Sequence, residues 1–462
     1  MGKETIKIDV AVIGAGPAGY AAALTTAGAG LSTALIDSAQ AGGTCLNRGC
    51  VPSKTWLAAD HIARTSKWAE KLGGAAQKYD FNKIREHQKS VIELGRKGLA
   101  GAFKKKGVRL VGGNASFISG TVIEVNGGIE GGQGDKIKIE FKNAVIAAGS
   151  EPLDFFGREK GFYNSDNIFS IDKIPSSIVI VGGGAVGAEM ATFFGGMGSK
   201  VTLVEMLEDI LPTEDADVRS VVKREFKKSG VTVKTGCGVE SASHENGACI
   251  VKLSDGAELS SEVLLTAAGR KPRTPGLGLD KAGVNLNTKG FIETDAQMRT
   301  SNENIYAAGD VAGRYLLAYT AHHEGVAAAR NILGKHASMD YRFVPSMIFT
   351  NPEVGSVGKT EDELKHLGIK CRIGKFFPRA LARAQAGGEI SGIVKVIVGE
   401  DKSILGIHIA SPCATEIIHS GVVAMAAGMK ADQLAETIYG HPTLSEAIQL
   451  AAADALGDSI YS

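Results

Sequence analysis

Residues 6–19 read IKIDVAVIGAGPAG, a short apolar strand pattern followed at once by three glycines in the arrangement GxGxxG. An alanine-rich helical segment comes next, and a second strand pattern at residues 32–36 ends at an acid. Strand, glycine turn, helix, strand and acid in this order are the fingerprint of a dinucleotide-binding βαβ unit. The first two glycines permit the turn and the approach of a diphosphate, the third permits close helix packing, and the acid holds a ribose hydroxyl. These residues are Gly14, Gly16, Gly19 and Asp37.

The same pattern occurs a second time. Residues 177–181 form a strand pattern, the motif GGGAVG follows, and residues 201–204 form a second strand pattern that ends at an acid. From first glycine to acid the spacing is 23 residues in both copies. One GxGxxG motif is weak support, but two matched copies predict two dinucleotide sites, the second formed by Gly182, Gly184, Gly187 and Glu205. Glu205 would repel a 2′-phosphate, and Met206 and Leu207 supply no arginine for one, which favours NAD over NADP.

Two cysteines lie five residues apart in residues 42–54, GGTCLNRGCVPSK. Pro52 suits the first turn of a helix, so Cys50 is expected at a helix N-terminus, where the positive end of the dipole favours thiolate. This is the environment of a reactive cysteine. Two inert buried thiols or half of a zinc site are the alternatives, although no further ligands stand nearby at finger-like spacing.

The remaining segments complete an α/β chain. Residues 60–106 are expected to be helical with a break near Gly73, residues 108–149 to form short strands with a hairpin loop at 130–135, and residues 145–149 and 263–269 to close the two nucleotide domains. From residue 345 strands precede helices without a glycine motif, which indicates an α+β unit suited to oligomerisation. We predict a first nucleotide-binding domain at 1–150, a NAD-binding domain at 151–275, a central domain at 276–344 that continues the first, and an oligomerisation domain at 345–462.

Composition narrows the class of protein. The 462 residues include 51 basic and 50 acidic ones, so nothing indicates a nucleic-acid or anionic-membrane partner. No apolar run approaches the roughly 18 residues that span a bilayer, and the N-terminus shows neither a signal nor a transit pattern. A soluble, cytoplasmic protein is therefore expected, or one of the mitochondrial matrix if the chain is a processed form. The other four cysteines are scattered and read as structural.

The tail carries the segment HPTLSE, residues 441–446. A single histidine is more often structural than catalytic. Here Pro442 stiffens the approach, and Glu446 could reach one ring nitrogen of His441 from the following helix, which would orient the ring and raise its basicity.

These parts fit one redox chain. One nucleotide can deliver or accept hydride, and the cysteine pair can hold two electrons as a dithiol. Because nicotinamide does not efficiently reduce disulfides directly, a flavin is the reasonable intermediary. The cysteines follow the first glycine motif, so FAD is expected there and NAD at the second motif. No metal is expected.

Both glycine motifs, GGTCLNRGCVPSK, the segment AAGD at 307–310 and HPTLSE resemble the flavin disulfide reductases, the class I pyridine nucleotide-disulfide oxidoreductase family, and among them the dihydrolipoamide dehydrogenases. The resemblance covers essentially the whole chain. It implies a homodimer of two Rossmann-like domains and a dimerisation domain, in which His441 of one subunit completes the active site of the other.

The resemblance also implies roles for single residues. Cys45 would exchange with the substrate, Cys50 would face the flavin, and His441 with Glu446 would deprotonate the incoming dithiol. Lys54 would lie near the flavin and pair with Glu189. The remaining FAD contacts implied by the resemblance are Gly43, Thr44, Ala115, Gly149, Asp310 and Ala318, and the further NAD contacts are Val239 and Gly269.

The implied reaction is the oxidation of protein-bound dihydrolipoamide by NAD, with a lipoylated acyltransferase or a glycine-cleavage carrier protein as partner. Another NAD(P)H-dependent disulfide reductase, similar to glutathione reductase, and a flavin-bearing subunit without turnover are the alternatives. Two departures from the family pattern lie near the expected flavin and dithiol channel. Tyr319 stands where a histidine is common, and Tyr439-Gly440 replaces His-Ala.

Overall fold

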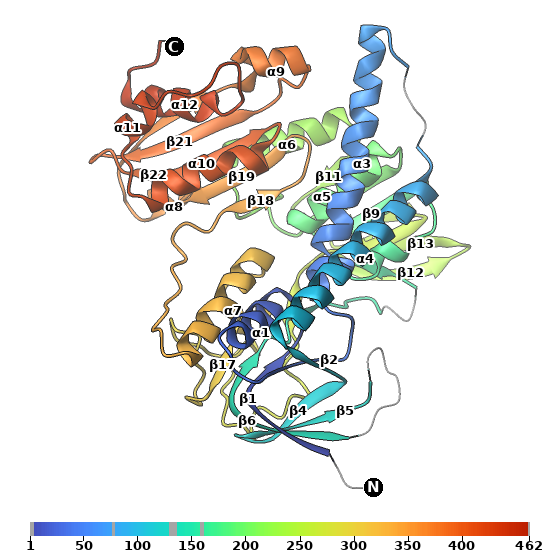
Figure 1. The fold of residues 1–462 in the computed structure, drawn as a ribbon. Helices are drawn as coiled ribbons and strands as arrows, with labels where there is room; N and C mark the ends of the chain where they lie inside the picture. Colours follow the sequence, from blue (N-terminus) through green and yellow to red (C-terminus); the bar gives the residue numbers. More distant parts are fainter. Residues whose placement is uncertain (1–3, 76–78, 129–135, 158–160, 461–462) are drawn as a thin grey trace.

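Three bodies make up the molecule in a computed structural model of the chain, which describes residues 4–75, 79–128, 136–157 and 161–460. Figure 1 shows the N-terminal sheet with β1 and β6 at one end, the two sheets that contain β9 and β13 beside the long helix α3, and the C-terminal sheet of β18 to β22 at the other end. The N- and C-termini lie at opposite ends of the view. The loop predicted at residues 130–135 lies outside the described residues.

The first domain is built on a seven-stranded sheet in the order β3-β2-β1-β6-β5-β4, with β17 pairing on β6. Strands β1, β2, β3, β6 and β17 are parallel to one another, while β5 pairs antiparallel with β6 and β4 pairs antiparallel with β5. The later strand β17 thus returns to the first sheet. The strands are β1 (Glu4–Ile13), β2 (Thr33–Asp37), β3 (Arg109–Gly112), β4 (Asn114–Ser119), β5 (Val122–Asn126), β6 (Ile137–Ile146) and β17 (Ile305–Ala307).

The helices of this domain bring both the first glycine motif and the cysteines to the carboxyl ends of the parallel strands. The first helix follows the glycine motif directly, and Cys50 is the first residue of α3, as predicted. The expected helical break is confirmed, because the chain leaves η1 at Gly73 with a φ of 82°. The elements are α1 (Pro17–Gly28), α2 (Gly43–Arg48), α3 (Cys50–Ala69), η1 (Glu70–Leu72), α4 (Phe81–Lys106), η5 (Asp310–Ala312) and α7 (Ala318–Ile332).

The second domain repeats the parallel arrangement in a sheet of order β11-β10-β9-β15-β8. Antiparallel strands β12, β13 and β14 form a separate three-stranded sheet, and β7 pairs with β16 between the domains. The elements are β7 (Ser150–Pro152), β8 (Tyr163–Asn164), η4 (Ile168–Ser170), β9 (Ser177–Val181), α5 (Ala185–Gly196), β10 (Lys200–Val204), α6 (Ala216–Lys228), β11 (Thr232–Lys234), β12 (Val239–Glu245), β13 (Ala248–Leu253), β14 (Glu258–Ser261), β15 (Val263–Thr266) and β16 (Arg270–Pro272).

The C-terminal domain is an antiparallel sheet in the order β18-β19-β22-β21-β20. Because side chains alternate along a strand, Val394 and Ile407 pack with α10 and α12 on one face, while Lys395 and His408 point to the other. The elements are β18 (Ser346–Ile348), β19 (Glu353–Gly358), α8 (Glu361–His366), β20 (Cys371–Phe376), η6 (Pro378–Ala380), α9 (Ala382–Gly387), β21 (Ile393–Gly399), β22 (Ile404–Ser411), α10 (Ala414–Ala426), α11 (Ala431–Glu436) and α12 (Glu446–Leu456).

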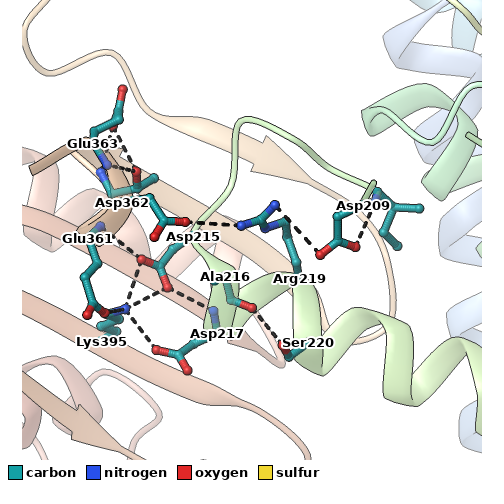
Figure 2. Close-up of polar contacts among 12 residues, drawn as sticks. Asp209, Asp215, Ala216, Asp217, Arg219, Ser220, Glu361, Asp362, Glu363 and Lys395 are labelled. Atoms are coloured by element: carbon teal, nitrogen blue, oxygen red, sulfur yellow. Dashed lines mark hydrogen bonds and ion pairs between the residues drawn. The ribbon is translucent and has the colours of Figure 1, made fainter. Parts of the chain in front are cut away.

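Ion pairs join the second and third domains. Lys395 is 1% exposed, and its Nζ lies 2.9 Å from Asp215, 2.9 Å from Asp217 and 2.5 Å from Glu361. Figure 2 shows this ammonium between the start of α6 and the start of α8. Glu214 accepts hydrogen bonds from the hydroxyl groups of two serines of the C-terminal sheet. These contacts fix the loop that follows β10 against the C-terminal domain.

The predicted fold class is confirmed: two parallel nucleotide-type sheets precede an α+β domain. The expected strands at residues 6–13, 177–181 and 201–204 occur as β1, β9 and β10. In the described part of the chain, no helix is both long and apolar enough to cross a bilayer.

Candidate active site

The first glycine of each motif has the same geometry. Gly14 and Gly182 have φ values of 101° and 107°, which L side chains rarely adopt. A Cβ atom would stand 2.2 Å from the Ala147 carbonyl oxygen in the first domain and 2.6 Å from that of Ala267 in the second. Both the turn and the neighbouring strand end therefore require glycine.

The other two positions of each motif need glycine for different reasons. A Cβ on Gly19 or Gly187 would lie 1.7 Å or 1.8 Å from the carbonyl oxygen of its motif's first glycine, so the helix could not approach. A Cβ on Gly184 would meet nothing within 4 Å, and one on Gly16 would meet no atom closer than 3.8 Å. The second glycine of each motif thus faces an open cradle that a side chain would fill.

The two acids hold their glycine loops in the same way. Asp37 and Glu205 each accept a hydrogen bond, at 2.6 Å, from the N–H of the residue after the first glycine. Each acid also accepts a hydrogen bond from the N–H of the residue two positions after itself in the chain. These donors are Ala39, at 2.8 Å from Asp37, and Leu207, at 2.9 Å from Glu205. Met206 is 72% exposed. The two residues that follow Glu205 in the chain, Met206 and Leu207, are not arginines that could receive a 2′-phosphate.

A cavity of about 450 Å³ joins the first glycine motif to the cysteines. Its volume lies in the range of pockets that hold organic ligands. The predicted site residues that line it are Gly14, Gly16, Asp37, Gly43, Thr44, Cys45, Cys50, Lys54, Gly149, Glu189, Asp310 and Ala318. The cavity is not lined by Gly19, which packs inside the first domain, by Ala115 on β4, or by Gly182, Gly184, Gly187, Glu205, Val239 and Gly269 of the second domain.

Cys45 and Cys50 are free thiols in hydrogen-bonding contact. The hydrogen bond from the Cys45 thiol, together with the charge of Lys54, lowers the pKa of Cys50 to about 7 against the opposing effect of burial. The same hydrogen bond raises the pKa of Cys45, and burial adds to that rise. Cys50 is also the first residue of a 20-residue helix, where the dipole favours an anion. Of the two thiols, Cys50 is therefore the more acidic, and Cys45 donates the hydrogen bond to it.

Lys54 and Glu189 form the predicted pair. The Lys54 Nζ lies 2.8 Å from both carboxylate oxygens of Glu189, which is 5% exposed. The Phe349 N–H donates to the same carboxylate at 3.1 Å, and the Phe349 ring lies 4.5 Å from the ammonium. The pair links α3, which begins at Cys50, to α5, which begins at the second glycine motif.

Asp310 belongs to a hydrogen-bonded chain that crosses the domain boundary. Ser150 donates to Asp310 at 2.5 Å, and Arg270 donates to Ser150 at 2.7 Å and to Asp166 at 3.0 Å. Burial raises the pKa of Asp310. Arg48, between the two cysteines in sequence, lies 3.2 Å from the other oxygen of Asp166.

A buried acid supports the turn that carries Asp310. Glu324 on α7 is 1% exposed and accepts hydrogen bonds from the Gly309 N–H at 2.6 Å and from the Tyr341 hydroxyl at 2.8 Å. Burial raises its pKa. Tyr319, one turn earlier on α7, donates to the Pro345 carbonyl oxygen, and burial raises its pKa, with the charges of Glu214 and Cys50 adding to the rise.

The tail pair is formed as predicted, but away from the cavity. The His441 Nδ1 lies 2.9 Å from Glu446, whose other oxygen accepts the Thr443 N–H at 2.6 Å. Burial opposes ionisation of Glu446, yet these two hydrogen bonds hold its pKa below the usual value. The His441 side chain is 69% exposed and does not line the cavity of its own subunit.

Residues 8–325 match the family described as pyridine nucleotide-disulphide oxidoreductase, and residues 344–452 match its dimerisation domain. The chain belongs to the pyridine nucleotide-disulphide oxidoreductase family. It is 35% identical to dihydrolipoyl dehydrogenase 3 of Haloarcula marismortui, over 100% of this chain and 99% of the relative. It is 37% identical to dihydrolipoyl dehydrogenase of Halobacterium salinarum, over 98% and 97% of the two chains.

Solved structures of this family have the same fold. LpdA of Mycobacterium tuberculosis superposes with a TM-score of 0.89 at 28% identity, over 96% of this chain and 99% of the other. A Cu(II) complex of the HOCl-induced flavoprotein disulfide reductase RclA of Escherichia coli has a TM-score of 0.88 at 27% identity, over 98% and 99%. The dimerisation domain supports the predicted homodimer.

The site residues fit the FAD and NAD that this family uses, which confirms both predicted cofactors. The open cradles at Gly16 and Gly184 leave room for a diphosphate beside the N–H groups of α1 and α5. Asp37, Lys54 and Asp310 line the cavity beside the first glycine motif, and Glu205 holds the second glycine loop as Asp37 holds the first. In the described part of the chain, no group of three or more histidine, cysteine or carboxylate residues is placed to hold a metal ion.

Several residues of this oxidoreductase site were not predicted. Ser150, Arg270 and Asp166 support Asp310 from another domain, and Glu324 supports the turn before it. Glu324 could have been suspected as an acid within an otherwise apolar helical face. The Ser150–Arg270 contact spans 120 residues and has no sequence signal.

Proposed function

We propose that this chain oxidises protein-bound dihydrolipoamide with NAD as electron acceptor. The observation that carries the proposal is the Cys45–Cys50 pair, in which the pKa of Cys50 is lowered to about 7 in a cavity that the first glycine motif also lines. A dithiol oxidase needs a cysteine pair beside one dinucleotide site. It also needs a connection from that pair to a second dinucleotide site, which the Lys54–Glu189 pair provides here. The relatives named dihydrolipoyl dehydrogenase support the substrate.

The reaction begins from the Cys45–Cys50 disulfide. One thiolate of dihydrolipoamide attacks the Cys45 sulfur, the Cys45–Cys50 bond breaks, and Cys50 leaves as thiolate. The low pKa of Cys50 makes it the better leaving group. The second substrate thiolate then attacks the sulfur bonded to Cys45, which releases lipoamide and leaves Cys45 to be protonated. Two electrons now reside on the cysteine pair, and the substrate's two protons have passed to the protein.

His441 of the partner subunit is proposed as the acceptor of those protons. The ring is exposed on its own subunit, and Glu446 holds its Nδ1, which leaves Nε2 free to face a substrate thiol. A carboxylate on one nitrogen orients the ring and raises the basicity of the other. The dimerisation domain supports a shared site, because His441 does not line the cavity of its own subunit.

Bound FAD would supply the two-electron relay between the cysteine pair and NAD. The chain's own residues orient this relay. Lys54 is fixed by Glu189 at the boundary between the two nucleotide domains, and Asp310 is fixed by Ser150 and the Glu324-supported turn. On the NAD side, the absence of an arginine at Met206 and Leu207 disfavours the NADPH-dependent alternative similar to glutathione reductase.

The proposed partner is a lipoylated carrier, either an acyltransferase of a 2-oxo acid complex or a glycine-cleavage carrier protein. A reducing intracellular compartment, the cytoplasm or the mitochondrial matrix, is proposed with it, supported by the four cysteines outside the redox pair, which form no disulfide. Fractionation of the native host tests the partner and the compartment together, by measuring whether this protein is recovered in the same fraction as a lipoylated carrier.

One assay tests the substrate. NAD reduction by dihydrolipoamide is compared with NADPH oxidation by glutathione disulfide, with the same holoenzyme. We expect the first to exceed the second by at least about 100-fold, and a preference for the second pair would contradict the proposal. Anaerobic titration with NADH excludes a subunit without turnover if long-wavelength thiolate–flavin absorbance develops.

A further inference from the structure

A second cavity of about 530 Å³ lies at the boundary between the second and third domains. One wall is a single face of α6, where Asp217, Val221, Arg224 and Lys228 recur at helical spacing. The opposite wall runs from β20 through η6 to the start of β21. It shares no lining residue with the cavity that holds the cysteines.

The second wall combines a cationic rim with exposed apolar side chains. Lys375 and Arg379 lie at the rim, and the Arg379 guanidinium stands 5.0 Å from the centre of the Phe377 ring. Phe377 is 41% exposed and Ile390 is 51% exposed, and both side chains line this cavity. A ligand with an apolar ring could cover both.

Cations outnumber carboxylates in this cavity. Its lining contains Arg224, Lys228, Lys375 and Arg379 but one acid, Asp217. Asp217 is already bound by Lys395 and Lys375, both at 2.9 Å. Glu225, next to Arg224 in the chain, likewise forms ion pairs with Arg224 at 3.3 Å and with Lys228 at 2.8 Å. Across the described residues, no carboxylate forms an ion pair with Arg379.

The two walls are held in place without a ligand. The Lys395 ammonium binds Asp215 and Asp217 at the beginning of α6, and Glu361 at the beginning of α8 (Figure 2). At the other end, the Ser391 hydroxyl donates to Glu225 at 2.6 Å. A preformed pocket loses less free energy on binding, because its walls need not be ordered by the ligand.

We propose that this second cavity is a binding site for a small aromatic phosphate. The phosphate would lie among Arg379, Arg224 and Lys375, and the ring would cover Phe377 and Ile390. Charge complementarity selects the anion, and the exposed apolar pair selects the ring. Such a ligand would bridge the NAD-binding and dimerisation domains, at a site that neither FAD nor NAD uses.

Calorimetric titration of the FAD-loaded enzyme, with NAD at saturation, tests the site. The probe is 2-naphthyl phosphate, and inorganic phosphate and 2-naphthol are the half-ligands. We expect one naphthyl phosphate per chain, bound at least about 10-fold more tightly than either half-ligand. Arg379→Gln should weaken binding about 10-fold, as expected for one charge-assisted contact, and Ile390→Ser about threefold.

Arg372→Gln is the matched control, since Arg372 lies on β20 but on the opposite face from Lys375. The affinity of the Arg372→Gln variant for 2-naphthyl phosphate should stay within twofold of the native value. The FAD content and the thermal midpoint should match across all variants. The proposal would be overturned by the absence of saturable binding with NAD present. Equal losses in the Arg372 and Arg379 variants, or inorganic phosphate binding as tightly as the probe, would also overturn it.

Discussion

Lys54 and Glu189 face one another across the boundary between the two nucleotide domains, with the ammonium 2.8 Å from both carboxylate oxygens. Lys54 lies one helical turn after Cys50, and Glu189 lies on the first turns of the helix that follows the second glycine motif. This contact therefore joins the redox cysteines to the NAD-binding domain through two charged groups. The charges act on the Cys50 thiolate in opposite directions.

Substitution of either partner should shift the pKa of Cys50, but with opposite sign. The charge of Lys54 lowers this pKa and that of Glu189 raises it. Lys54→Met should therefore move the value upward from about 7, and Glu189→Gln should move it downward. Ultraviolet absorbance of the thiolate against pH measures both. Lys7→Met, at an exposed pair, is the control, and shifts of the same sign would contradict the assignment.

Loss of the Cys45 thiol should raise the pKa of Cys50 by more than loss of Lys54 does. The hydrogen bond from Cys45 is the largest contribution to the lowered value, so Cys45→Ala should return it toward the ordinary value of 9.0. Long-wavelength absorbance of the FAD-loaded enzyme would then appear only at higher pH. An unchanged midpoint would show that the helix dipole and Lys54 suffice without Cys45.

His441→Gln should slow the dithiol half-reaction by roughly 100-fold or more, as expected for loss of a general base, and leave NADH-to-flavin transfer nearly unchanged. Glu446→Gln should give a smaller loss of the same kind, because it removes the group that orients the ring. Rapid-mixing kinetics separates the two half-reactions. Equal loss of both would mean that His441 is not the base.

A mixed dimer tests the shared active site. Inactive Cys45→Ser and His441→Gln subunits, co-expressed with different tags and purified as the heterodimer, should recover one intact site and close to half of native activity. A heterodimer as inactive as both parents would place His441 and Cys45 in the same subunit's site.

Glu324→Ala should weaken FAD retention, because the Gly309 N–H loses the carboxylate that fixes the turn before Asp310. A buried N–H group left without its hydrogen-bond acceptor costs about 1–3 kcal/mol, or about 5- to 150-fold in affinity if all of it falls on FAD binding. Tyr341→Phe removes only the other donor to Glu324 and should have a smaller effect. Flavin release during dilution measures both, and equal retention by Glu324→Ala and native protein would contradict the role.

Lys395→Met should destabilise the protein by about 3–5 kcal/mol, because it leaves the buried carboxylate of Asp215 without its cation. Desolvation opposes this charge, yet the three carboxylates raise the pKa of Lys395 above its ordinary 10.5. Its contribution is therefore present below pH 10.5 and lost as pH rises further. Asp215 and Asp217 have pKa values below 3.8 despite burial, so their contribution is lost only as pH falls below that value.

Denaturant unfolding across this pH range measures the effect, and Lys402→Met is the matched control. Lys402 pairs with Asp432 at 2.8 Å, but its side chain is 50% exposed, so solvent replaces the partner and little change is expected. Equal destabilisation by the two substitutions would contradict a special role for the buried cluster.

Local patterns predicted most of the nucleotide domains. The glycine spacing anticipated the positive φ of Gly14 and Gly182 and the tight approach at Gly19 and Gly187, because each requirement arises within one βαβ unit. The predicted FAD contact Ala115 stays a prediction, since β4 lies away from the cavity lining. The domain boundaries and the role of Tyr319 likewise stay predictions.

The amino-acid sequence by itself determined the two dinucleotide motifs, the position of Cys50 at a helix N-terminus and the pairing of His441 with Glu446. These features depend on residues close together in the chain, where backbone geometry alone fixes their relation. Only the tertiary structure decided that Ser150 and Arg270 support Asp310, that Glu324 holds its turn, and that Lys395 joins two domains. Some of those contacts join residues more than a hundred positions apart in the chain, and others join a buried acid to a donor that packing brings near it. No local periodicity in the sequence encodes either kind of contact.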